Sequence, residues 1–170
     1  MLHRALKQAV RWGLVPRNVT EAVNIPKLVR EEVNALSPEE ARRFLATARR
    51  DRLEALYVLA VHCELRRGEL LGLRWPDVDL DAKTLRVSRQ LQRMREGGGL
   101  VFSEPKNASR RTVDLPKRAV EALRSHRKRQ LEEQLRAGSN WQDYGLIFAS
   151  GKGTPLDAQN IVNRQFKPLL

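Results

Sequence analysis

The chain has 170 residues, and its 32 Lys and Arg outnumber its 20 Asp and Glu, which gives a formal net charge of +12. This surplus favours a polyanionic partner such as nucleic acid, and the 41% of hydrophobic residues excludes a chain without a folded core. The one cysteine, Cys63, excludes an intramolecular disulfide and a zinc framework, and it indicates a reducing compartment.

Residues 1–24 predict one amphipathic helix, because apolar residues recur there at helical spacing before Gly13 and Pro16. Charged residues interrupt this stretch, unlike the core of a signal peptide, and no segment approaches membrane-spanning length. A basic amphipathic helix also suits a membrane surface, but we expect no membrane partner and a cytoplasmic protein. Residues 25–36 mix Pro, Lys, Arg and Glu without periodicity, which is typical of an interdomain linker.

A further helix is predicted to begin at Ser37, which is followed by a proline and two glutamates. Serine at the N-cap with glutamate three residues later forms a capping box, and proline suits the first helical position. The apolar residues of its inward face are Ala41, Phe44, Leu45 and Ala48. We interpret residues 37–170 as the main domain.

The apolar run at residues 57–61 predicts an internal helix that delivers Arg66 at its end. Glu69 follows three residues later on the same helical face, where it can brace the Arg66 guanidinium. A guanidinium held in this way presents a rigid fork of donors suited to a phosphate group. On spacing alone a structural ion pair explains the same pattern, so both interpretations are open at this point.

The next part of the chain predicts a small antiparallel sheet. Residues 84–91 predict a strand, the glycines at 97–99 a turn, and residues 100–102 the next strand of a β-meander. Lys106 is expected at the tip of a following hairpin, with residues 111–115 as its return strand. A lysine in such a place is otherwise a solvated loop residue.

More helices are predicted towards the C-terminus. A long helix with a basic cluster is expected from Ala119 to near Gly138, with Leu131 and Leu135 on its apolar stripe. Residues 146–148 predict a short buried strand before a final helix. The predicted fold class is therefore α+β, mostly helical with a small three-stranded antiparallel sheet.

The segment around Arg66 matches a known motif at the following positions: Leu65-Arg66, Glu69-Leu70, Leu73, Trp75, Asp77, Val78 and Asp79. It resembles the first active-site box of the tyrosine recombinase (phage integrase) family, whose usual form is Thr-Gly-Leu-Arg-x-x-Glu-Leu-x-x-Leu-x-Trp-x-Asp-(Val/Ile)-Asp. Cys63 and Glu64 stand where Thr and Gly are usual. A glycine there relaxes the turn that aims the arginine, so Glu64 affects the aim of Arg66.

The resemblance implies DNA integration by site-specific recombination, with double-stranded DNA as partner and a phage or mobile element as source. In the family, a tyrosine attacks a DNA phosphodiester, arginines stabilise the pentavalent state, and a lysine protonates the leaving 5'-oxygen, without metal or other cofactor. By this resemblance Arg66 and Lys106 are catalytic and Glu69 supports Arg66. The residues expected to contact DNA are Arg67, Ser109, Arg110 and Arg111.

The resemblance also predicts the domain organisation. Residues 1–24 resemble the last helix and tail of the core-binding domain, and residues 37–170 resemble the N-terminal part of the catalytic domain. We expect a fragment truncated at both ends, which self-associates through the surfaces that truncation exposes.

The family's nucleophilic tyrosine and His-x-x-Arg box are not recognised in the sequence, so the isolated chain is expected to be inactive. His126-Arg-Lys-Arg129 fits the box literally, but it falls on the charged helix and is predicted to be a solvated face. Tyr57 and Tyr144 are predicted to be packing residues.

Two other interpretations are open. One is a non-catalytic DNA-binding remnant or interaction module, in which Arg66 and Lys106 only bind phosphate. The other is a basic RNA-binding protein, which the absence of an RNA-module signature disfavours. A cleavage assay with the purified chain separates the catalytic interpretation from the first of these.

Overall fold

The computed structural model describes residues 2–23, 35–94, 98–105 and 111–169. The chain divides into two compact units, residues 1–35 and residues 36–170, and each unit is described by itself. The predicted linker, residues 25–36, lies almost entirely outside the described residues.

The N-terminal unit contains α1 (Leu2–Arg11) and a short 3-10 helix (Val19–Ala22). The two are joined by Asn18, whose side chain is buried. Its Nδ2 donates to the His3 carbonyl at 3.2 Å, and its Oδ1 accepts from the Thr20 hydroxyl at 2.6 Å. No residue of α1 is fully buried; on the predicted apolar stripe Leu6, Ala9 and Val10 are half-buried.

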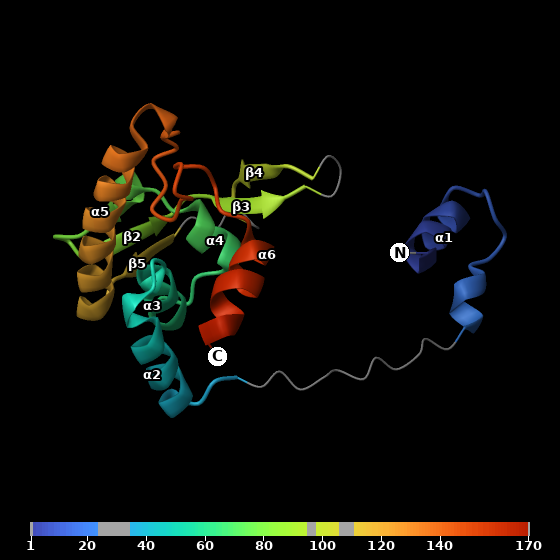
Figure 1. Cartoon of the computed structure of the whole chain (residues 1–170). Helices are drawn as coiled ribbons and strands as arrows, with labels where there is room; N and C mark the ends of the chain where they lie inside the picture. Colours follow the sequence, from blue (N-terminus) through green and yellow to red (C-terminus); the bar gives the residue numbers. More distant parts are fainter. Residues whose placement is uncertain (1, 24–34, 95–97, 106–110, 170) are drawn as a thin grey trace. The chain divides into compact units, whose positions relative to one another are not determined.

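The C-terminal unit holds the other helices, which Figure 1 labels: α2 (Pro38–Thr47), α3 (Glu54–His62), α4 (Arg67–Gly72), α5 (Lys117–Ala137) and α6 (Ala158–Ile161). The predicted capping box is present at the start of α2. The Ser37 hydroxyl accepts from the Glu40 N–H at 3.2 Å, and the Glu40 carboxylate accepts from the Ser37 N–H at 2.8 Å. Both donors would otherwise lack an intrahelical partner, so this local signal settles where the helix begins.

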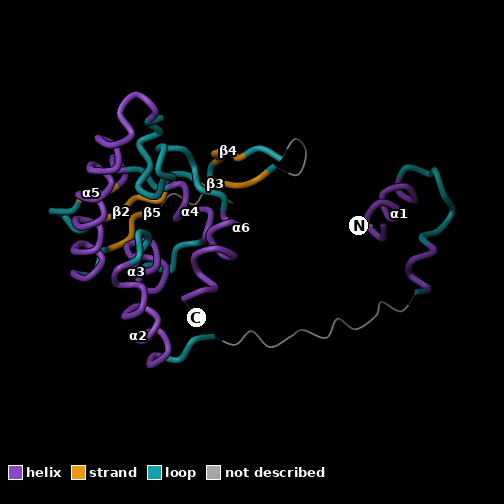
Figure 2. The backbone as a smooth tube through the Cα atoms, viewed as in Figure 1, coloured by secondary structure: helices purple, strands orange, loops and turns teal. Residues whose placement is uncertain are grey.

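The strands of the described residues form two antiparallel sheets, which Figure 2 shows as separate groups. One sheet has the order β1-β2-β5 and the other pairs β3 with β4; their bounds are β1 (Val78–Asp79), β2 (Thr84–Val87), β3 (Gln90–Arg93), β4 (Leu100–Ser103) and β5 (Arg111–Asp114). The α+β class and the three-stranded antiparallel sheet are therefore confirmed.

The predicted β-meander is wrong, because residues 84–91 do not form one strand. The chain leaves the first sheet after Val87 and enters the second at Gln90. The two residues between these strands bond elsewhere: the Ser88 hydroxyl donates to Asp77 Oδ1 at 3.0 Å, and Arg89 Nε donates to the Gly72 carbonyl at 2.8 Å. These bonds redirect the backbone, and the hairpin of β3 and β4 leaves the sheet.

One buried apolar cluster connects the helices and the sheet of this unit. The long helix α5 packs along α3 (Figure 1) and contributes Ala119, Val120 and Leu123 to the cluster. Its predicted stripe ends early, because Leu131 and Leu135 are 52% and 83% exposed. The core-facing side of α5 continues through the buried His126 and Gln130, so the two leucines lie on a different side of the helix.

Two further predictions on the C-terminal half are wrong. Residues 146–148 are buried but form only an isolated bridge between Leu146 and Arg74. His126 is not part of a solvated face, since only 3% of it is exposed. Its Nε2 donates to the Ile147 carbonyl at 2.7 Å, and its ring contacts Trp75 and Phe148. The charged residues around His126 in the sequence conceal these apolar neighbours, which come from elsewhere in the chain.

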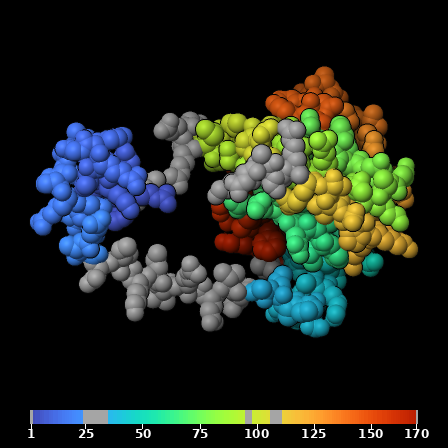
Figure 3. All heavy atoms as spheres, turned by 180° about the vertical axis from the view of Figure 1, so that it is seen from behind, coloured from blue at the N-terminus to red at the C-terminus, as the bar shows by residue number. Residues whose placement is uncertain are grey.

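The C-terminal segment continues α6 through a π-helical turn (Val162–Phe166) and a 3-10 turn (Lys167–Leu169). Phe166 meets the Phe44 ring edge to face, with 5.3 Å between ring centroids. Figure 3 shows the red C-terminal atoms beside those of the cyan and teal helices. Aromatic contacts of this geometry add to the apolar area that they bury, so this segment belongs to the same core as α2 and α3.

Candidate active site

Arg66 begins a helix instead of ending one, contrary to the sequence-based expectation. The buried helix α3 ends at His62, and Arg66 is the N-cap residue of α4. The chain turns sharply between the two helices. Because α4 itself is buried from Glu69 to Gly72, the start of α4 is held in place while the Arg66 side chain stays 66% exposed.

The turn before Arg66 requires a left-handed residue. Glu64 has a φ of +50°, a conformation that glycine adopts freely and that L residues with a Cβ adopt at a cost. The family motif has glycine at this position. Because Glu64 replaces that glycine, the turn that leads into Arg66 carries backbone strain, as the sequence predicted.

Glu69 is the centre of the site, and its side chain is only 1% exposed. Its Oε2 accepts from the backbone N–H of Arg66 at 3.0 Å, which caps α4, and its Oε1 accepts from Arg66 Nη1 at 3.0 Å. Arg111 donates to the same carboxylate from Nη1 at 3.2 Å and from Nη2 at 2.8 Å. Two guanidinium groups thus share one buried carboxylate, which leaves a net positive charge at the site.

The pKa of Glu69 reflects this arrangement. Burial by itself raises the pKa of the carboxyl, but hydrogen bonds from Arg111 and from the backbone and side chain of Arg66 lower it below its ordinary value. The ion pair with Glu69 also raises the pKa of Arg111. Glu69 is therefore ionised at neutral pH and keeps both guanidinium groups in position.

An open groove of about 550 Å³ lies beside the start of α4. Its walls come from α4, from β3 and β4, and from the start of α6, and they include Arg66, Arg67, Gln92 and Gln159. Gly68 lies in the α4 wall, where a Cβ would come within 2.8 Å of the Leu91 carbonyl oxygen. This glycine lets α4 approach β3 closely, and so the basic residues of the helix line the groove.

Arg93 and Asp157 close one side of the groove, and nothing in the sequence pointed to this pair. Arg93 donates from Nε to Asp157 Oδ2 at 3.0 Å, and Asp157 Oδ1 accepts from the Asn160 N–H at 2.9 Å. The hydrogen bonds from Arg93 lower the pKa of Asp157. The two residues are 64 positions apart, so no local spacing signals that they meet.

The predicted site residues fall into two groups. Arg66, Glu69 and Arg111 are brought together, and Arg67 lines the groove beside them. Lys106, Ser109 and Arg110 lie outside the described residues. The guanidinium of Arg111 donates two of its hydrogen bonds to Glu69, which makes it a support for Arg66.

The tyrosines and the cysteine lie outside the groove. Tyr57 is 2% exposed, and burial, together with the charge of Asp51, raises its pKa to about 12. Tyr144 is 46% exposed, so the prediction that it is a packing residue is wrong. Cys63 is buried as predicted, and burial raises the pKa of its thiol. Neither a raised thiol pKa nor a raised phenol pKa favours a nucleophile.

The family model described as Phage integrase family matches residues 34–169. The chain belongs to the phage integrase family. Among curated relatives, the chain is 36% identical over 153 residues to a XerC-like tyrosine recombinase of Caldanaerobacter subterraneus subsp. tengcongensis. The match covers 84% of the chain and 39% of the relative. It is 34% identical over 176 residues to an integrase of Streptomyces ambofaciens, which covers 99% of the chain and 44% of the relative.

Solved structures show the same fold for this chain. The Tn1549 transposon integrase in complex with a circular intermediate DNA superposes with a TM-score of 0.74 at 20% identity, over 98% of the chain and 54% of that protein. The XerA recombinase gives a TM-score of 0.60 at 24% identity, over 86% of the chain and 44% of that protein. The chain spans less than half the length of the curated relatives above.

Two negative observations apply to the described residues only. None of the helices there is long and apolar enough to cross a membrane. The described part of the chain also contains no group of His, Cys, Asp and Glu suited to hold a metal ion.

Proposed function

We propose that the chain carries part of the active centre of a site-specific DNA recombinase and binds double-stranded DNA through the groove at Arg66. The observation that supports this most strongly is the exposed Arg66 guanidinium, which is anchored on the buried Glu69 carboxylate at the start of α4. Such an anchored fork of donors suits a phosphate with developing negative charge. The Tn1549 integrase, which shares the fold, is described in complex with DNA.

The proposed chemistry assigns a separate task to each residue. Arg66 stabilises the negative charge on the non-bridging oxygens of the attacked phosphodiester, because its planar donors match two of those oxygens. Glu69 holds Arg66 in place without touching the DNA. Lys106 donates a proton to the leaving 5'-oxygen, a task that suits a compact ammonium group. Arg67, Ser109, Arg110 and Arg111 belong to the proposed DNA-contacting surface, with Arg111 also bracing the site.

A salt titration of DNA binding tests the proposal. With a formal charge of +12, the chain should bind a duplex with an affinity that falls steeply as the salt concentration rises, and with little sequence preference. Fluorescence anisotropy with a labelled duplex at several KCl concentrations measures this slope. An affinity that is insensitive to salt would contradict the proposal.

Charge-matched variants connect the binding to the groove. Arg66→Ala should weaken DNA binding several-fold more than Arg136→Ala, although both remove one exposed guanidinium. Arg66→Lys should restore part of the affinity, because it restores the charge without the planar fork. Equal effects of Arg66→Ala and Arg136→Ala would show that only net charge matters, and would argue against the groove.

A cleavage assay tests which step the chain can perform. We propose that the 170-residue chain forms no covalent adduct with a nicked suicide duplex, because Tyr57 is buried and Tyr144 does not line the groove. Denaturing gel electrophoresis detects an adduct, which survives detergent. A detergent-stable adduct that is lost in Tyr144→Phe or Tyr57→Phe would overturn this assignment.

The proposal also includes the self-association of the chain on DNA and its location in the cell. A lambda integrase that shares the fold is described as a dimer on a core site and as a tetramer on a Holliday junction. We propose that this chain also self-associates on DNA and that it acts in the cytoplasm. Sedimentation velocity with and without a duplex tests the first statement, and a constant stoichiometry of one chain per duplex would contradict it.

A further inference from the structure

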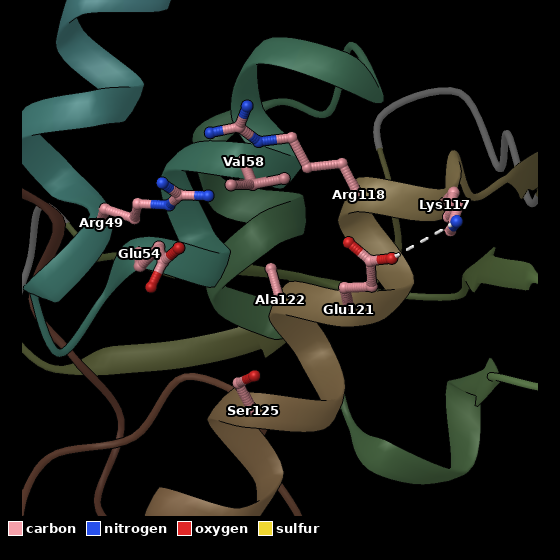
Figure 4. Close-up of a pocket in the computed structure, with 8 residues that line it drawn as sticks. All are labelled: Arg49, Glu54, Val58, Lys117, Arg118, Glu121, Ala122 and Ser125. Carbon is pink, nitrogen blue, oxygen red and sulfur yellow. Dashed lines mark ion pairs between the residues drawn. The ribbon is translucent and has the colours of Figure 1, made fainter.

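A second hollow in the C-terminal unit lies between the end of α2, α3 and the start of α5, and Figure 4 shows it. Its volume is about 450 Å³, and Arg49, Glu54, Val58, Arg118, Glu121 and Ser125 line it. None of these residues lines the groove at Arg66. The hollow is therefore a separate feature of the surface, and the function proposed above does not use it.

Two guanidinium groups converge over this hollow. Arg49 comes from the 3-10 turn after α2, and Arg118 comes from the first turn of α5. Figure 4 shows both side chains extending towards each other over Val58. Neither has a hydrogen bond or an ion pair with any described residue, and like charges that approach without an anion between them repel.

The carboxylates of the hollow have other partners. Glu54 lies 3.9 Å from Arg129 Nη2, and Glu121 lies 4.0 Å from Lys117 Nζ. Each carboxylate is therefore next to a different cation, and the charged residues that line the hollow, three cations and two carboxylates, carry a net positive charge. The charge of the hollow favours an anionic ligand.

The start of α5 adds to this preference. The helix is 21 residues long, its first turn contains no acidic residue, and its N-cap residue, Pro116, contributes no side-chain hydrogen bond. The partial positive charge of the helix N-terminus therefore adds to that of Arg118. Val58 and Ala122 add apolar lining to the hollow.

We propose that this hollow binds a phosphate group, with Arg49 and Arg118 as the two residues that clamp it. The phosphate belongs either to a DNA backbone that runs outside the groove at Arg66 or to a free phosphate or pyrophosphate ion. The chemistry of recognition is the same for both sources, since paired guanidinium groups match the oxygens of a phosphate.

The test compares two charge-matched double variants. Arg49→Gln/Arg118→Gln removes the clamp, and Arg50→Gln/Arg136→Gln removes two exposed arginines that line none of the hollows described above. All four side chains are exposed, so both variants should keep the fold, which circular dichroism and thermal unfolding check. The first readout is the arginine Nε–H NMR signals during titration with inorganic phosphate and with pyrophosphate.

Saturable shifts of the Arg49 and Arg118 signals would support the site if they reach half their maximum at a phosphate concentration at least about tenfold lower than the shifts of Arg50 and Arg136 do. Small shifts that grow in proportion at all four arginines without saturation would overturn it. Loss of saturation in Arg49→Gln/Arg118→Gln alone, and not in the control variant, is the expected result.

Duplex binding as a function of salt identifies the source of the phosphate. If a DNA phosphate fills the hollow, the Arg49→Gln/Arg118→Gln variant should lower the salt slope by about one phosphate contact relative to the control variant. An equal slope in both variants, together with saturable phosphate binding, supports the free ion as ligand. An equal slope without saturable phosphate binding overturns the proposal for both sources.

Discussion

Glu64 is the residue at which the backbone next to the candidate site carries strain. Its φ of +50° places an L side chain in the left-handed region, where the Cβ comes close to the following carbonyl oxygen. Glycine at this position would avoid that contact, although it loses more conformational entropy on folding. The two effects oppose each other, and the steric one is the larger.

Replacing Glu64 should therefore stabilise the protein. We expect Glu64→Gly to raise the free energy of unfolding by roughly 0.5–1 kcal/mol, measured by urea denaturation. Glu64→Gln is the control, because it removes the same charge and keeps the strained backbone. If the two variants were equally stable, charge and not backbone conformation would explain the effect, and the strain at Glu64 would be refuted.

Glu69 shows what could be predicted at the scale of residues. The spacing of Arg66 and Glu69 indicated an ion pair, and the structure confirms it. The ion pair of Arg111 with the same carboxylate could not be predicted, because Arg111 meets Glu69 only when β5 pairs with β2. The sequence likewise gave no sign that His126 is buried, since its neighbours Trp75 and Phe148 are distant in the chain.

The packing of α4 on β3 decides where the groove lies at the scale of elements. A Cβ on Gly68 would meet the Leu91 carbonyl oxygen at 2.8 Å, and one on Gly72 would meet the Gln90 Cα at 3.1 Å. In both cases the neighbour is backbone, which cannot rotate away as a flexible side chain can. The helix and the strand would have to separate to accept a side chain.

Gly68→Ala should consequently destabilise the protein by roughly 1–3 kcal/mol, the range for overpacking in a close contact. Gly99→Ala is the matched control, because a Cβ there meets nothing within 4 Å. Thermal unfolding of both variants gives the comparison. A Gly68→Ala variant as stable as the Gly99→Ala variant would mean that α4 and β3 are free to move apart.

Elements with local signals were predictable, and elements that depend on distant contacts were not. The capping box at Ser37 and Glu40 is contained in four residues and correctly marked the start of α2. The break between β2 and β3 depends on bonds from Ser88 and Arg89 to distant partners, so the β-rich pattern of this stretch predicted one continuous strand. The exposed leucines of α5 followed from the same limitation, because the apolar spacing did not reveal that the polar His126 and Gln130 face the core.

At the scale of the C-terminal unit, the buried His126 links stability to pH. Burial lowers the pKa of this histidine below its ordinary value, and the hydrogen bond to the Ile147 carbonyl only partly opposes the effect. Its Nδ1 is buried without a hydrogen-bond partner among the described residues. A proton on Nδ1 would therefore lack an acceptor, so the folded state keeps the ring neutral.

The unfolded chain binds a proton at His126 more readily than the folded chain does. Stability from the neutral ring is therefore complete above the ordinary histidine pKa of about 6.5, and it decreases as the pH falls below that value towards the lowered folded pKa. The decrease approaches about 1.4 kcal/mol per pH unit in this window. Urea denaturation between about pH 8 and 5.5 measures it.

Histidine variants separate this effect from general acid sensitivity. His126→Gln keeps a donor for the Ile147 carbonyl and should flatten the pH dependence in this window, even if the variant is less stable at pH 8. His62→Gln, at an exposed histidine, is the control for the loss of a histidine. The same slope in all three proteins would exclude His126 as its source.

The bond between Arg111 and Glu69 also has a consequence for the order of events during folding. It joins residues 42 positions apart, whereas Arg66 and Glu69 meet within one helical turn, and closing the larger loop costs more chain entropy. The ion pair of Arg66 with Glu69 can thus form early in folding, whereas the ion pair of Arg111 with Glu69 forms only when β5 joins the sheet. Arg111→Ala should accelerate unfolding and leave the refolding rate nearly unchanged, which stopped-flow kinetics in urea would reveal. While β5 is detached, the Arg66–Glu69 pair would remain, but the buried Glu69 carboxylate would lack its second guanidinium partner.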